Sequence, residues 1–107
     1  MGAITENAII IPRGDTARKT IDLTTEEGEL YEVGEKDKLV LKVKKNLCDK
    51  EPCILKEVIG SNEFHFKPED TENLPFGSYF YSVRVFTAEG DKYTPIDKEL
   101  FEVGEVV

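Results

Sequence analysis

In the stretch Ser78-Tyr79-Phe80-Tyr81-Ser82-Val83-Arg84-Val85-Phe86, large apolar side chains recur at every second position. Tyr79, Tyr81, Val83 and Val85 share one face, and Arg84 lies on the other. Successive side chains of a β-strand point to opposite faces of the sheet, so this period of two predicts a strand with one buried face. The run Leu39-Val40-Leu41-Lys42-Val43-Lys44 alternates in the same way and turns its lysines away from the apolar side.

Six further runs have the composition of strands. They are Ala8–Ile11, Thr16–Thr24, Ile54–Ile59, Glu63–Phe66, Lys92–Thr94 and Leu100–Val103. In the second of these, Lys19 interrupts the apolar face, as it would at a strand end or a sheet edge. Eight short runs in 107 residues have the spacing that is typical of a β-sandwich or a small barrel.

Turn-forming residues separate these runs. Pro12-Arg13-Gly14-Asp15 is expected to form a turn, and Glu89-Gly90-Asp91 predicts a tight hairpin. The one helical signal is a short turn near residues 69–74, with Pro68 at its start, acids in its first turn and Pro75 after it. The sequence has no internal repeat and no linker, so residues 1–107 are predicted to form a single domain.

The segment before the aromatic strand indicates a more specific architecture. An acidic helical turn, then Gly77, then Tyr79-Phe80-Tyr81 resembles the tyrosine corner of immunoglobulin-like sandwiches. There a tyrosine packs inward and its hydroxyl bonds back to the preceding corner, which is the role we expect for Tyr79. The alternative is an ordinary aromatic strand after a loop. An antibody-type domain is excluded, because Tyr81 stands where the second cysteine would be and the chain has no tryptophan.

The predicted fold class is therefore all-β, an immunoglobulin-like β-sandwich of about seven or eight short strands. Fourteen basic and twenty-two acidic residues give a formal net charge of −8. This charge argues against nucleic acid and against an anionic membrane as partners, because both attract clustered lysine and arginine. The first residues, Met1–Glu6, have neither the basic nor the apolar region of a signal peptide, so synthesis in the cytoplasm is expected.

Residues that could carry chemistry are few. Cys48 and Cys53 lie in a polar loop with four residues between them, and His65 is the only histidine. Two cysteines and one histidine do not complete a zinc site, and the expected state of the thiols in the cytoplasm is reduced. A loop-closing disulfide is the alternative, after release into an oxidising medium. His65 alternates with Phe64 and Phe66 and is expected to face solvent or a neighbouring sheet edge.

No nucleophile–base pair is recognisable, so the sequence predicts a protein that is not an enzyme and that needs no cofactor or metal. The tripeptide Arg13-Gly14-Asp15 is read by integrins, but we interpret it as a plain turn. Val40, Phe80 and Phe86 lie on the faces opposite the predicted core. They either lie under a loop or form a contact patch for another subunit, and the sequence does not separate these two interpretations.

A family resemblance adds to this interpretation. The chain contains, in order, Ile11-Pro12-Arg13-Gly14-Asp15-Thr16-Ala17, Gly28-Glu29-Leu30-Tyr31, Lys36–Lys45, Phe66–Thr71 and Gly77–Val83. This succession resembles the small immunoglobulin-like proteins of phage and prophage tails and is similar to the N-terminal domain of baseplate upper proteins.

The resemblance implies a structural subunit without catalytic residues, made in the host cytoplasm and then built into a virion or phage-like particle. Its implied partners are other virion or tail proteins, or further copies of itself. The alternative function is a secreted or surface immunoglobulin-like module for adhesion or carbohydrate binding.

Overall fold

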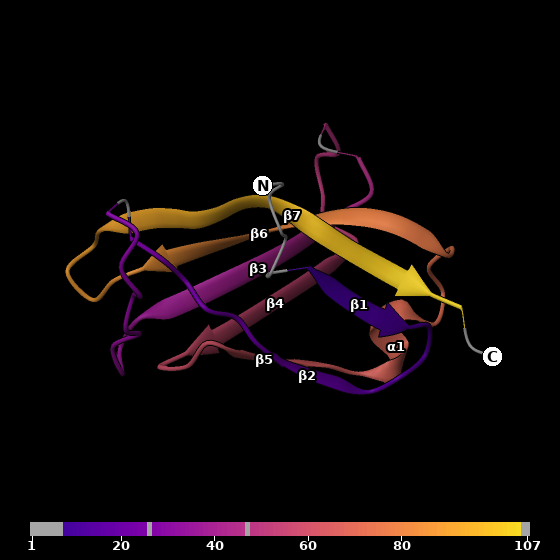
Figure 1. The fold of residues 1–107 in the computed structure, drawn as a ribbon, viewed down its shortest axis with the longest axis horizontal. Coiled ribbons are helices and arrows are strands. Elements are labelled where there is room, and N and C mark those ends of the chain that lie inside the picture. The colour runs from indigo at the N-terminus through magenta and orange to yellow at the C-terminus, as the bar shows by residue number, and fades with distance from the viewer. Residues whose placement is uncertain (1–7, 26, 47, 106–107) are drawn as a thin grey trace.

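The computed structural model describes residues 8–25, 27–46 and 48–105 (Figure 1). Residues 1–7, on which the expectation of cytoplasmic synthesis depends, lie outside this part. The described residues confirm the all-β class, because they are mostly strand, with one helix of four residues. The elements are β1 (Ile9–Pro12), β2 (Ala17–Thr20), β3 (Lys38–Lys44), β4 (Ile54–Ile59), β5 (Glu63–Phe66), α1 (Pro68–Thr71), β6 (Gly77–Phe86) and β7 (Lys92–Gly104).

The strands form two sheets of unequal size. The larger has the order β1-β7-β6-β3-β4, and the smaller pairs β2 with β5. All pairs are antiparallel except β1 with β7, which is parallel. The rings of Phe66 on β5 and Phe101 on β7 lie 5.6 Å apart, so the smaller sheet packs on one face of the larger one.

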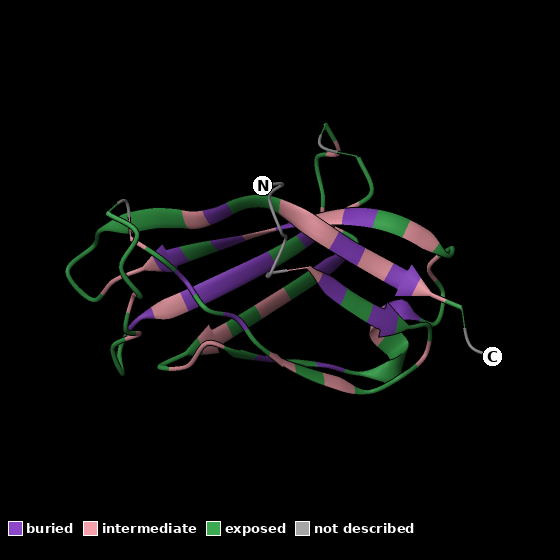
Figure 2. Cartoon of the chain, viewed as in Figure 1, coloured by how far each residue is buried: buried purple, intermediate pink, exposed green. Residues whose placement is uncertain are grey.

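Side chains that alternate along the strands fill the space between the two sheets. Figure 2 shows the alternation as buried and exposed bands along β1, whereas Leu39, Val40 and Leu41 of β3 are buried in succession. Tyr79, Tyr81, Val83 and Val85 of β6 are all buried, as the period of two predicts. Each belongs to a single apolar cluster that also contains Phe64 and Phe66 from the smaller sheet. One core therefore serves both layers.

The prediction of separate strands at Lys92–Thr94 and Leu100–Val103 is wrong, because both belong to the continuous strand β7. The pairing with β6 shifts twice, between Tyr81 and Val83 and again between Val83 and Val85. At each shift β7 contains one residue more than β6, which is the definition of a β-bulge. The bulges let the strand continue through Pro95, which has no amide to donate to a ladder.

Two other predicted elements are shorter in the structure. Only Ala17–Thr20 of the run Thr16–Thr24 is a strand, although Ile21 and Leu23 beyond it are buried as predicted. The helix covers Pro68–Thr71 rather than residues 69–74, and the amide of Glu72 closes it on the carbonyl of Pro68. The turn predicted at Arg13-Gly14-Asp15 is present, with Gly14 at a φ of 84°.

Candidate functional site

The outer face of the five-stranded sheet is the face turned away from β2 and β5. Strand pairing brings its polar residues side by side. Lys42 on β3 lies opposite Ser82 on β6, and Lys44 lies opposite Phe80. Lysines that are separated along a strand by one apolar core residue share a face, so the alternation in β3 places both ammonium groups on this surface.

A bulge in β7 adds two charged residues to the same place. Glu99 pairs with Tyr81 and Ile96 with Val83, so Asp97 and Lys98 together oppose the single residue Ser82. Bulges of this kind change the direction of side chains next to the extra residue. Here the bulge brings a lysine of β7 to the surface formed by β3 and β6.

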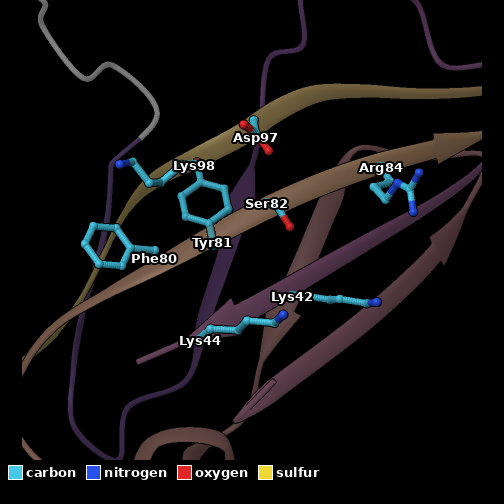
Figure 3. A pocket seen from close by; sticks show the side chains of 8 residues that line it. All are labelled: Lys42, Lys44, Phe80, Tyr81, Ser82, Arg84, Asp97 and Lys98. Atoms are coloured by element: carbon cyan, nitrogen blue, oxygen red, sulfur yellow. The ribbon is translucent and has the colours of Figure 1, made fainter. Parts of the chain in front are cut away.

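These side chains surround a hollow of about 480 Å³, which we call the basic groove. Figure 3 shows that its residues come from β3, β6 and β7. Four are cationic and one is a carboxylate, in a chain with a net charge of −8. The residues that line it are Lys42, Lys44, Phe80, Tyr81, Ser82, Arg84, Asp97 and Lys98.

Among the described residues, no cation of the groove forms an ion pair, although Asp97 belongs to the same lining. In the part of the chain that the structure describes, the ion pairs are Lys38–Glu57 and Lys56–Asp70, and neither includes a residue of the groove. Lys98 instead places its ammonium nitrogen 5.6 Å from the ring centroid of Phe80. Such contacts with an aromatic ring leave the charge in place and available to an anion.

The second outward aromatic, Phe86, lies among cations as well. The charged groups of Lys38, Arg84 and Lys92 are 6.0, 5.8 and 6.0 Å from the centroid of its ring. The outer face therefore combines aromatic rings with cationic side chains over the length of β6.

The residues predicted as a contact patch differ in exposure. Val40 lies on the outer face but is only 7% exposed, so it offers no surface to a partner. Its cross-strand neighbours are Arg84 and Glu57, whose long stems can cover an apolar residue. Phe80 and Phe86 are partly exposed. The patch is thus two aromatic rings with surrounding cations rather than an apolar surface, and Val40 is not part of it.

Tyr79 packs inward at the start of β6. It is 2% exposed, and its hydroxyl donates a 2.8 Å hydrogen bond to the carbonyl of Pro75, four residues earlier. A hydroxyl bonded to the backbone a few residues upstream is the contact that a tyrosine corner makes. Burial raises the pKa of Tyr79, and the ammonium of Lys45 lies 4.6 Å from the centroid of its ring. The residue therefore fixes the corner between α1 and β6.

The two cysteines are free and lie in exposed positions. The thiol of Cys53 donates to the carbonyl of Val43 over 3.3 Å. Partial burial of this sulfur raises the pKa of Cys53, although the residue as a whole is exposed. A reactive cysteine needs the opposite shift, toward the thiolate. The pKa of Cys53 is thus shifted away from the reactive thiolate form.

His65 and Arg13 both lie beside residues of this chain that account for their positions. His65 is exposed, as its alternation predicts, and pairs with Arg18 between β5 and β2. The guanidinium of Arg13 stacks over the ring of Phe76 at 4.1 Å, and the amide of Gly14 donates to Thr71. The tripeptide Arg13-Gly14-Asp15 therefore belongs to a turn whose arginine is engaged by the protein itself.

A second hollow, of about 520 Å³, lies where the connection between β2 and β3 meets the end of β6 and the start of β7. Its wall includes Tyr31 and Tyr93, the latter 51% exposed, together with three threonines. No pattern in the sequence indicates this hollow, because its residues come from segments far apart in the chain. The residues that line it are Thr24, Thr25, Glu27, Tyr31, Val85, Lys92, Tyr93, Thr94 and Pro95.

Residues 8–25, 27–46 and 48–105 contain no group of three or more histidine, cysteine or acidic side chains placed to hold a metal ion. In the same residues, no helix has the length and apolar character needed to pass through a bilayer. No protein-family model matches this chain, and no curated protein matches it either.

Proposed function

We propose that this chain is an immunoglobulin-like β-sandwich that acts through protein–protein contact, as a non-enzymatic structural subunit of a phage or prophage-derived tail baseplate. The immunoglobulin-like part is supported by two facing sheets and by the hydrogen bond from Tyr79 to Pro75. The division of strands, five and two, departs from the more even division of antibody domains. The placement in a tail baseplate rests on the sequence resemblance.

The outer face of the large sheet is the single observation that carries the contact function. One face of this sheet is covered by β2 and β5, whereas the other presents the basic groove, Phe80 and Phe86 to the surroundings. Aromatic rings and arginine are the residues that protein interfaces favour at their centres. A rigid sheet also holds such side chains in place without the entropy cost of ordering a loop.

Co-expression with the products of neighbouring genes tests this proposal. We expect a stoichiometric complex with at least one tail or baseplate protein on size-exclusion chromatography with light scattering. Charge reversal in the groove (Lys42→Glu with Lys44→Glu) should weaken that complex at least about tenfold, since it replaces attraction by repulsion at the contact. Reversal of Arg18 and Lys50, two exposed cations outside the groove, is the matched control. Absence of any complex with these gene products would refute the baseplate role.

The second hollow favours one alternative, an adhesion or carbohydrate-binding module. Tyrosine rings and hydroxyl side chains suit a sugar, which needs an apolar face to stack on and hydrogen-bond partners around it. Binding of a glycan that is lost in Tyr93→Ala and kept in Lys42→Glu would favour this function over the baseplate role.

A further inference from the structure

We propose that the basic groove receives the acidic loop of a second copy of this chain. The acidic loop is defined by the exposed residues Glu27, Glu29, Leu30 and Glu32 of the connection between β2 and β3. The proposal deepens the proposed function and rests on it, because it identifies which surfaces a contact module would bring together and what partner the groove fits.

Charge complementarity is the first argument. The groove contains four cationic residues and one carboxylate, a net charge of +3. Because the whole chain carries −8, the residues outside the groove must together carry −11. Each copy thus supplies a strongly acidic surface that matches the groove of another copy. A groove with this charge is unfavourable to any partner surface rich in lysine and arginine.

The acidic loop exposes an apolar side chain between carboxylates, which matches the aromatic ring and the cations of the basic groove. Leu30 is 64% exposed, and it lies between exposed glutamates on either side. The groove offers the aromatic ring of Phe80 among its cations. An apolar side chain with flanking carboxylates, placed on a ring with flanking ammonium groups, satisfies both the apolar and the charged parts of each surface.

Backbone hydrogen bonds join the described residues on the two sides of the loop. The amide of Thr25 donates to the carbonyl of Glu29 at 2.7 Å, and the amide of Tyr31 donates to the carbonyl of Leu23 at 2.8 Å. Thr24 and Leu30 form an antiparallel bridge between these bonds. Docking of a preordered loop loses less conformational entropy than docking of a flexible one, so more of the contact energy appears as affinity.

One molecule does not fill its own groove with this loop. Tyr31, at the base of the loop, packs against the core cluster, which lies on the inner side of the large sheet. The groove opens on the outer side of the same sheet. Figure 1 shows the connection between β2 and β3 at the end of the sheet where β3 begins. The contact is therefore between different surfaces of two molecules, and such heterologous contacts build rings or filaments.

Sedimentation velocity of the purified chain tests the proposal. We expect the wild-type chain to have an average mass that rises with concentration above that of one chain. The groove-reversed variant (Lys42→Glu with Lys44→Glu) and the loop-reversed variant (Glu29→Lys with Glu32→Lys) should each associate at least about tenfold more weakly, since like charges then meet at the contact. Arg18→Glu with Lys50→Glu alters the net charge as much as the groove reversal and should leave association unchanged.

A mixture of the two reversed variants gives the decisive result. The acidic groove of one variant then meets the basic loop of the other, so an equimolar mixture should associate again although each variant alone does not. This rescue also shows that both variants are folded. A mixture that stays monomeric refutes the contact, as does a wild-type chain that is monomeric at all concentrations. A monomer whose groove cations bind an acidic polymer such as heparin also refutes it.

The outcomes separate this inference from the proposed function. A monomeric wild-type chain that forms a complex with a neighbouring gene product refutes the self-contact and supports the baseplate role. Self-association with charge-reversal rescue, in the absence of any complex with tail proteins, supports the self-contact and counts against the baseplate role.

Discussion

The hydroxyl of Tyr31 donates a 2.6 Å hydrogen bond to a carboxylate oxygen of Asp37, which is 9% exposed. The same oxygen accepts the amide of Gly34 at 2.9 Å. These bonds join the end of the acidic loop to the residue just before β3. The orientation of the loop relative to the large sheet therefore depends on one buried carboxylate.

This pair predicts a loss of stability at alkaline pH. Burial, reinforced by the hydrogen bond to Asp37 and by its charge, raises the pKa of Tyr31 from 10.0 to about 12. The folded state thus holds the proton more tightly than the unfolded chain, so the stabilisation is complete below pH 10 and is lost as the pH rises toward about 12. Urea unfolding should show the free-energy difference between wild type and Tyr31→Phe shrinking across this range. Parallel curves would contradict the assignment, because phenylalanine has no proton to lose.

The hydrogen bond of Tyr79 predicts a modest stability change. Tyr79→Phe removes the bond to Pro75 but keeps the buried ring, so the free energy of unfolding should fall by about 0.5–1.5 kcal/mol. Tyr93→Phe is the control, because Tyr93 is 51% exposed and its change should stay within about 0.5 kcal/mol. Equal unfolding midpoints in urea for the two variants would show that the Tyr79 hydroxyl contributes nothing to the corner.

Local patterns were sufficient to predict most strands. Ile54–Ile59 and Glu63–Phe66 have the predicted bounds, because Gly60 and Asn62 mark the turn between them and Pro68 follows. Burial of alternate residues in β6 followed directly from the period of two. In each of these segments, the segment's own residues and those next to it in the sequence determine the structure.

Features that depend on distant residues were not predicted. The parallel pairing of β1 with β7 joins the two ends of the described chain, and no local pattern indicates it. The merging of two runs into β7 depends on bulges that exist only relative to β6. The sequence showed that Lys42 and Lys44 face outward, but the groove also needs Lys98, which reaches it through a bulge and through the order of the strands.

Replacement of the buried Thr71 by valine should remove a hydrogen bond at the turn between β1 and β2. The hydroxyl of Thr71 accepts the amide of Gly14 over 2.8 Å, and the residue is fully buried. Thr71→Val keeps the shape but leaves that amide without its acceptor, which should reduce the free energy of unfolding by about 1–3 kcal/mol. Thr71→Ser keeps the oxygen and is the control. Hydrogen exchange at Gly14 should be faster in the valine variant than in the serine variant, and equal rates would contradict the role of the hydroxyl.

Gly60 lies in the turn between β4 and β5. Replacing it by alanine should destabilise the fold much more than replacing Gly90 by alanine. Gly60 has a φ of +73°, and a Cβ at this position would lie 2.8 Å from the carbonyl oxygen of Glu35, a backbone atom that cannot rotate away. Gly90 has a φ of +96°, but a Cβ there would meet nothing within 4 Å. In both alanine variants, the left-handed backbone should lower the free energy of unfolding by about 1–2 kcal/mol. Only Gly60→Ala should lower it further, because only its Cβ meets the carbonyl oxygen of Glu35. Equal melting temperatures for the two variants would mean that the turn can move away from Glu35, and so that the segment preceding β3 is not fixed against it.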